Sequence, residues 1–228
     1  MDVVDLIYIF DNDASSLNLK IKGELFKYLI KVRRHSVGDE IGFRNRDSIE
    51  ILHTYKIIDI DARVATFELI DSKECKVEPK HFMHLAWCVI DTKSIEKVLP
   101  SLNEIGVGKI SFIYCDRSQR NIKLDFKRFE RILEASMQQC GRTSYMEFDV
   151  YKNIESFIKE FDDVKVFDFC QNILDAEVEL NRVLIGCEGG FSAHEKEMLK
   201  NQKVFRLDTP MVLRSESATV AVASKILL

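Results

Sequence analysis

The sequence predicts an α/β protein in which a small all-β domain precedes a larger domain built on a parallel sheet. In the first third, short alternating runs of apolar and polar residues are separated by turn residues, which is typical of strands. From residue 84 onward, strand-like and helix-like segments alternate, which predicts a parallel sheet with helices on both faces. A charged stretch with a proline, residues 71–80, separates the two patterns. We therefore predict a boundary there, with domains at residues 1–72 and 73–228.

The individual elements follow from the same patterns. In the first domain, we predict a short helix at 23–32 and strands at 7–10, 39–45, 48–61 and 65–70. In the second, strands are predicted at 84–90, 109–115, 145–151, 164–170, 182–186 and 204–209. Helices are predicted at 94–106, 125–141 and 153–161, after Ser192, and from about residue 215 to the C-terminus, with residues 215–217 as the cap of the last helix.

The composition is that of a soluble globular protein. The chain has 46% hydrophobic and 31% charged residues and a net charge of −4, so its overall charge demands no polyanionic partner. The N-terminus is acidic and lacks the basic region of a signal peptide, and no apolar run approaches membrane-spanning length. We therefore expect a cytoplasmic protein with no membrane partner.

The six cysteines form no CxxC pair and lie mainly in apolar or strand-like runs, so we expect reduced thiols that pack as small apolar residues. Cys75, His81, His84 and Cys88 are metal-ligand types. Their spacing matches no structural zinc pattern, and residues 84–90 have the pattern of a buried strand, so no metal is expected.

Three of the nine glycines lie within five positions, at Gly186, Gly189 and Gly190, between a predicted strand and a predicted helix. Glycines there let the backbone approach a ligand closely, and the following helix N-terminus offers free N–H groups. Ser192 and Glu195 have the spacing of a capping box, which predicts a helix start near residue 193. A plain tight turn between strand and helix is the alternative interpretation.

The second informative segment is residues 205–224. A strand meets Pro210, and a helix rich in small residues follows, which permits very close helix packing. The alternative is a C-terminal helix that only completes the core.

Together, the two segments resemble the signature of the RsmE family of 16S rRNA (uracil-N3) methyltransferases, within the SPOUT superfamily. The family's first motif is Gly-Pro-Glu-Gly-Gly-Phe-Ser/Thr, and residues 186–192 here read Gly-Cys-Glu-Gly-Gly-Phe-Ser. Its second is Leu-Gly-x-x-Ile-Leu-Arg-x-Glu-Thr-Ala, and residues 207–218 read Leu-Asp-Thr-Pro-Met-Val-Leu-Arg-Ser-Glu-Ser-Ala. Shorter matches lie at residues 32–34, 37–39, 103–107, 117–120 and 139–142. Cys187, Asp208 and Ser217 replace the family's proline, glycine and threonine, and none of these changes removes an obvious chemical group.

The resemblance implies a SPOUT-type, trefoil-knotted α/β domain with a small N-terminal PUA-like β-barrel that binds RNA. It also implies S-adenosyl-L-methionine as the cofactor, 16S rRNA of the small ribosomal subunit as the partner, and a homodimer. The residues that it assigns to the cofactor are Phe169, Ile185, Gly186, Glu188, Gly189, Gly190, Leu207, Val212 and Leu213.

For catalysis we consider Arg214 and Glu216, with Glu188 as a second candidate for the general base. Arg214 would hold a uracil carbonyl or a phosphate, and its alternative role is a surface ion pair. Glu216 also suits the helix N-terminus as a simple charge, and a carboxylate with an ordinary pKa of about 4.3 is a weak base for a uracil imide.

RNA binding is expected from two basic segments. Residues 20–46 contain eight Lys and Arg against three acidic residues, and residues 117–131 contain six against two. A charge run is often only a solvated face. The residues that we assign to RNA are Arg33, Arg34, Arg117, Arg120, Gln139 and Arg142; the last two are three positions apart and are expected to share a helix face.

Two alternative functions stay open at this point. One is a SPOUT enzyme that methylates the ribose 2′-OH of RNA. The other is a non-enzymatic, RNA-binding ribosome-assembly factor, which would fit the departures at Cys187 and Asp208.

Overall fold

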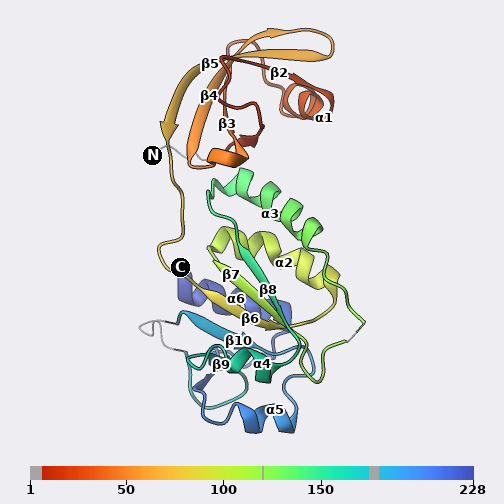
Figure 1. Cartoon of the computed structure of the whole chain (residues 1–228), viewed down its shortest axis with the longest axis vertical. Coiled ribbons are helices and arrows are strands. Elements are labelled where there is room, and N and C mark those ends of the chain that lie inside the picture. The colour runs from red at the N-terminus through yellow and green to blue at the C-terminus, as the bar shows by residue number, and fades with distance from the viewer. Residues whose placement is uncertain (1–6, 120, 175–179) are drawn as a thin grey trace. The chain divides into compact units, whose positions relative to one another are not determined.

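The computed structural model of the chain describes residues 7–119, 121–174 and 180–228 (Figure 1). The chain forms two compact units. The first is Met1–Glu78 together with Met137–Ser144, and the second is Pro79–Ser136 together with Tyr145–Leu228.

The N-terminal unit is built on a five-stranded sheet in the order β1-β3-β4-β5-β2. The strands are β1 (Ile9–Phe10), β2 (Asn18–Lys22), β3 (Glu40–Arg44), β4 (Ile51–Ile60) and β5 (Val64–Glu74). All neighbours are antiparallel except β1 and β3. The interior of this unit is aromatic, because the Phe43 ring packs edge-on against Tyr55 and Phe67.

The predicted helix at 23–32 is present as two continuous turns, α1 (Gly23–Phe26) and the π-helical η2 (Lys27–Val32), and a short 3-10 turn, η3 (Arg46–Ser48), precedes β4. The apolar side of α1 and η2 buries Phe26 and Leu29 in the core of the unit. Strand β2 was not predicted, although its burial alternates strictly in a five-residue run. Strand β5 runs to Glu74 and so continues into the charged stretch that we expected to be a boundary.

The segment Met137–Ser144 belongs to the N-terminal unit although it lies far along the chain. Tyr8 donates its backbone N–H to the Gln138 carbonyl (3.1 Å) and its hydroxyl to the Arg142 carbonyl (2.8 Å). The Val77 N–H donates to Thr143 Oγ1 (2.9 Å). A small apolar cluster also joins Tyr8, Phe10, Leu52, Cys75 and Met137. These contacts complete a unit whose two segments no local sequence pattern connects.

The second unit contains a six-stranded sheet in the order β11-β9-β10-β6-β7-β8, and every pairing in it is parallel. The strands are β6 (His84–Cys88), β7 (Lys109–Ile113), β8 (Glu147–Tyr151), β9 (Lys165–Phe167), β10 (Arg182–Ile185) and β11 (Val204–Phe205). The central strand β6 is buried at all five positions, as expected for a parallel strand covered on both faces.

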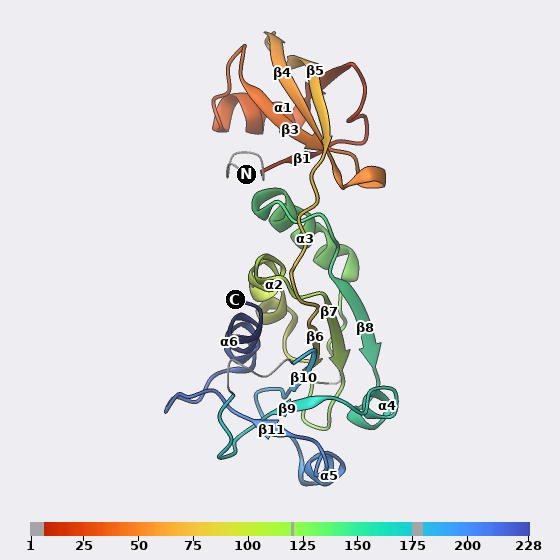
Figure 2. The same cartoon turned by 90° about the vertical axis from the view of Figure 1, so that its left-hand side faces the viewer.

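Helices cover both faces of this sheet. They are α2 (Thr92–Ile105), α3 (Phe126–Cys140), α4 (Ile154–Ile158), α5 (Ala193–Met198) and α6 (Ser215–Leu227). Helices α2 and α6 pack against each other on one face, and α4 lies on the other (Figure 2). The prediction of an α/β fold with an N-terminal β domain is confirmed. Within the described residues, no helix is both long and apolar enough to cross a membrane.

Candidate functional site

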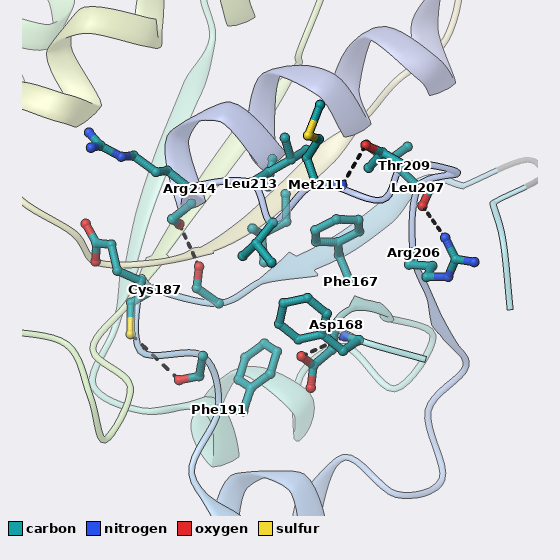
Figure 3. A pocket seen from close by; sticks show the side chains of 18 residues that line it. Phe167, Asp168, Cys187, Phe191, Arg206, Leu207, Thr209, Met211, Leu213 and Arg214 are labelled. Carbon is teal, nitrogen blue, oxygen red and sulfur yellow. Dashed lines mark hydrogen bonds between the residues drawn. The ribbon is translucent and has the colours of Figure 1, made fainter. Parts of the chain in front are cut away.

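A pocket opens at the carboxyl ends of β9, β10 and β11, where open α/β sheets usually bind ligands (Figure 3). Its volume is about 280 Å³, close to the lower end of the roughly 300–1,000 Å³ of small-molecule pockets. Apolar side chains form most of its wall. The lining residues come from three segments: 167–169, 185–191 and 206–218.

The glycine segment forms one side of this pocket. The Gly190 N–H donates to the Cys187 carbonyl (2.8 Å), which closes a tight turn, and Gly190 adopts a φ of +66° that a residue with a side chain rarely adopts. The Ser192 side chain accepts from the Glu195 N–H at the start of α5, and the Glu195 carboxylate accepts from the Ser192 N–H. The predicted capping box is therefore confirmed. The backbone between Gly186 and Ser192 is therefore held at both ends.

The start of α6 is anchored to the same segment by one buried hydroxyl. Ser215 Oγ donates to the Gly186 carbonyl (2.6 Å) and accepts from the indole N–H of Trp87 (2.8 Å). Ser215 was expected to cap the helix. The helix cap is Arg214 instead, without a side-chain capping bond, because the Ser215 hydroxyl is used to join α6, β6 and the glycine segment.

The loop after β7 holds the glycine segment from its outer side. The Arg117 guanidinium donates to the Gly189 carbonyl, and Ser192 Oγ donates to the Asp116 carboxylate (2.5 Å). The carboxylate of the buried Glu195 accepts from the backbone N–H groups of Asp116 (2.8 Å) and Ser192 (2.8 Å). This loop and the glycine segment therefore form one hydrogen-bonded assembly.

The opposite side of the pocket is exposed and apolar. Phe169, Met211 and Val212 are each more than 70% exposed, which is unusual for large apolar side chains. All three line the pocket, so a ligand that enters it would cover part of them. We call these three residues the rim of the pocket. Asp168 also lines the pocket and forms an ion pair with Lys196 (2.7 Å).

The structure brings most of the predicted cofactor residues together. Eight of them line the pocket: Phe169, Ile185, Gly186, Glu188, Gly190, Leu207, Val212 and Leu213. Gly189 does not line it, since its carbonyl faces Arg117 and a side chain there would meet Arg117 at 3.1 Å. Arg214 also lines the pocket, whereas Glu216 lies one position into α6 and does not.

Sequence reasoning missed several lining residues, namely Phe167, Asp168, Phe191, Arg206, Thr209 and Met211. Phe167 ends β9 and packs its ring against Phe205 at the end of β11 (5.9 Å between centroids). The available signal was that both residues end strands predicted to lie in one parallel sheet, whose carboxyl ends share an edge.

The residues predicted to bind RNA lie in different environments. Arg33 and Arg34 are exposed after η2, and Arg33 Nε donates to the Tyr28 hydroxyl (2.9 Å). Arg117 is exposed but bonded to the glycine segment, and Arg120 lies outside the described residues.

Gln139 and Arg142 do not share a helix face, contrary to our expectation. Helix α3 ends at Cys140, and Gly141 turns the chain with a φ of +87°. Gln139 is exposed, whereas Arg142 is 5% exposed, and burial lowers the pKa of its guanidinium.

No group of three or more His, Cys, Asp or Glu residues in the described part of the chain is arranged to hold a metal ion. His84, one of the metal-ligand types noted in the sequence, contacts Ser111 Oγ (2.7 Å) and accepts from Arg182 Nε (3.1 Å).

Comparison with known proteins gives concordant results. A family model described as an RNA methyltransferase domain matches residues 77–227. A Helicobacter pylori protein named ribosomal RNA small subunit methyltransferase E is 39% identical over 95% of this chain and 97% of its own length. A protein of the same name from Aquifex aeolicus is 27% identical over 96% of this chain and 98% of its own.

Solved structures agree in fold. A ribosomal RNA small subunit methyltransferase E from Neisseria gonorrhoeae, bound to S-adenosyl methionine, matches with a TM-score of 0.70 at 15% identity, over 96% of this chain and 95% of that one. A methyltransferase from Legionella pneumophila in complex with SAM matches with a TM-score of 0.72 at 22% identity, over 96% of this chain and 94% of that one.

Proposed function

Because the chain belongs to the RNA methyltransferase family that includes ribosomal RNA small subunit methyltransferase E, we propose that it methylates N3 of a uridine in 16S rRNA. The coarser activity is that of its family: the chain is an S-adenosyl-L-methionine-dependent methyltransferase of small-subunit rRNA. The base, the atom and the residues that act on them are the proposal.

The pocket fits the cofactor chemically. An adenine ring needs apolar walls, which Phe167, Leu207 and Leu213 supply, and a few backbone amides and carbonyls, which the glycine segment supplies. When bound, S-adenosylmethionine supplies an electrophilic methyl group on a positively charged sulfonium. The exposed rim residues Met211 and Val212 would then lose contact with water and help keep the site dry.

Arg214 is the residue that we propose to act on the substrate. It is exposed at the pocket, at the N-terminus of α6, and its side chain makes no ion pair or hydrogen bond with any described residue. The alternative of a surface ion pair therefore finds no partner in the described part of the chain. A free guanidinium here suits a uracil carbonyl, where it would stabilise the charge that develops as N3 loses its proton.

Glu216 is our proposed base, with Glu188 as the second candidate. Glu216 is half-buried in the first turn of α6, and Glu188 is an exposed pocket-lining residue. A base must come within hydrogen-bond reach of the proton that it removes; Glu188 lines the pocket itself, and Glu216 is two positions along the chain from the pocket-lining Arg214. Replacing each separately by glutamine distinguishes them.

Exposed Arg33, Arg34 and Gln139 are proposed to contact the rRNA. We assign Arg117 and Gly189 to holding the glycine segment in place, because the Arg117 guanidinium donates to the Gly189 carbonyl. A trefoil knot and a homodimer stay predictions, and sedimentation tests the second.

The observation that carries the proposal is the pocket at the strand ends, which is lined by both the glycine segment and Arg214. The test is methyl transfer from S-adenosylmethionine to small ribosomal subunits that lack the modification, followed by mass spectrometry of the nucleosides. N3-methyluridine is the expected product.

The other outcomes point to the alternatives. A 2′-O-methylated nucleoside would replace the base methyltransferase with a ribose methyltransferase. No transfer to free rRNA or to subunits, with cofactor binding also absent in calorimetry, would contradict the proposed reaction and favour an assembly factor.

A further inference from the structure

Three cysteines lie at the carboxyl ends of three neighbouring strands of the parallel sheet. Cys88 ends β6, Cys115 follows β7 and Cys187 follows β10, and β6 lies between the other two strands. The sulfur atoms of Cys115 and Cys187 are 3.5 Å apart, although the residues are separated by 72 positions. Both side chains are free thiols.

The surroundings favour a thiolate on one sulfur of this pair. Cys115 Sγ lies 3.1 Å from Ser118 Oγ. Hydrogen bonds from Cys187, Cys88 and Ser118 hold the pKa of Cys115 well below its usual range, and the same pairing with Cys115 raises the pKa of Cys187. A thiolate is the reactive form of cysteine, so Cys115 is the expected attacking sulfur of the pair.

The pocket supplies the route to these sulfurs. Cys187 lines the pocket wall, and Figure 3 shows its sulfur pointing into the glycine turn, towards the Gly190 carbonyl (3.8 Å). The exposed fraction of Cys187 is only 5% and that of Cys115 is 2%, so a reagent must be small, and the pocket that Cys187 lines is the route that we infer. A bound cofactor would block this route.

We propose that Cys115 and Cys187 form a reversible disulfide when hydrogen peroxide enters the empty pocket, and that this bond weakens cofactor binding. The inference rests on the proposed use of this pocket for S-adenosylmethionine. In the family motif to which residues 186–192 correspond, this position is a proline, which cannot form such a bond. The thiol pair is therefore a feature of this chain and not of the motif.

The chemistry balances with peroxide as the oxidant. One thiolate of the pair attacks a peroxide oxygen, the O–O bond breaks, and hydroxide leaves and takes up a proton as water. The other group, a thiol, attacks the resulting sulfenic sulfur as the S–O bond breaks, and its proton goes to the leaving hydroxide, which departs as a second water. Two thiols lose two electrons to form one S–S bond, and one peroxide is reduced to two waters.

The bond would change the pocket because it must shorten a contact. A disulfide has an S–S length of about 2.05 Å, so the two sulfurs must approach by roughly 1.5 Å from their present separation. Cys187 lies within the turn that Gly190 closes, and the preceding Gly186 lines the pocket. Oxidation therefore moves the backbone that we assign to the cofactor. By linkage, cofactor binding must oppose oxidation to the same degree.

The experiment treats the full-length protein with hydrogen peroxide, with and without saturating S-adenosylmethionine, and digests it with trypsin without reduction. Cleavage places the three cysteines on different peptides, residues 81–93, 110–117 and 183–196. We expect a cross-linked pair of the second and third peptides, at least tenfold less of it when the cofactor is present, and its loss after dithiothreitol treatment.

Calorimetry then compares cofactor affinity before and after oxidation. We expect the Kd for S-adenosylmethionine to rise at least tenfold in the wild type and to recover on reduction. Cys187→Pro and Cys115→Ser should abolish the peroxide-induced change, whatever their own starting affinity. Cys170→Ser, a change at a more exposed cysteine next to Phe169, should respond like the wild type and is the matched control.

Three results would overturn the inference. They are a Cys88–Cys115 cross-link in place of the expected one, only sulfinic or sulfonic products, and an oxidised protein whose Kd is unchanged. If the reduced protein bound no S-adenosylmethionine, the proposed function would fail with it, whereas normal binding by both forms would reject the redox inference alone.

Discussion

Replacing Ser215 by alanine tests whether one hydroxyl joins the core strand β6, the glycine segment and the last helix. The side chain is 5% exposed and makes two bonds, from the Trp87 indole and to the Gly186 carbonyl. Trp87 is completely buried, so its N–H would lose its acceptor without access to water, at a cost of about 1–3 kcal/mol. The Gly186 carbonyl borders the pocket and can turn to water, so its loss adds only up to about 1 kcal/mol.

We therefore expect Ser215→Ala to lower the free energy of unfolding by about 1–4 kcal/mol. Trp87 is the only tryptophan of the chain, so its fluorescence in a urea titration follows the unfolding of the C-terminal unit. Ser217→Ala, in the first turn of the same helix but exposed, is the matched control and should stay within about 0.5 kcal/mol of the wild type. Equal stability of the two variants would refute the role of the Ser215 hydroxyl.

Three further predictions concern pH, catalysis and RNA. Burial, together with nearby positive charge, lowers the pKa of His84 from 6.5 to about 4, so as the pH falls the unfolded chain takes up this proton before the folded one does. The folded state should therefore lose about 3 kcal/mol of stability as the pH falls from above 6.5 to about 4. His84→Gln should flatten that part of a curve of unfolding free energy against pH. Arg214→Ala should lower the rate of methyl transfer at least about tenfold, with the same free energy of unfolding and little change in cofactor Kd. Lys225→Ala, at the exposed end of the same helix, is the control and should transfer methyl groups at the wild-type rate. Full activity of Arg214→Ala would remove Arg214 from catalysis. RNA binding should weaken steeply with salt, and replacing Arg33 and Arg34 together should reduce the slope of log K against log salt by about 2; an unchanged slope would exclude both from phosphate contact.

The fold was predictable where a local pattern matched a burial pattern. The alternation of strands and helices after residue 84 predicted a parallel sheet, and the structure has one with six strands. Boundaries were less predictable. Residues 164–170 were expected to be a strand, but β9 stops at Phe167, because the chain there leaves the sheet to form the pocket wall.

The site was predictable only where a motif names its residues. The glycine segment and the residues before α6 were located from their motifs, and most of them line one pocket. Arg117 shows the limit of this reasoning. Its charge suggested RNA, yet its guanidinium donates to the Gly189 carbonyl, a contact between residues 72 positions apart that no local pattern encodes. The same holds for the 3.5 Å approach of Cys115 and Cys187.

The discontinuous N-terminal unit has a consequence for folding during synthesis. Its first segment ends at Glu78, but hydrogen-bond partners of Tyr8, Phe10 and Val77 lie in Met137–Ser144, so these contacts wait for about 66 more residues. At roughly 5–20 residues per second, this delay is about 3–13 s. Strands β6 and β7 are made in that interval. The first unit to be started is therefore not finished before the second begins, and the two parts of the chain fold over overlapping periods of translation.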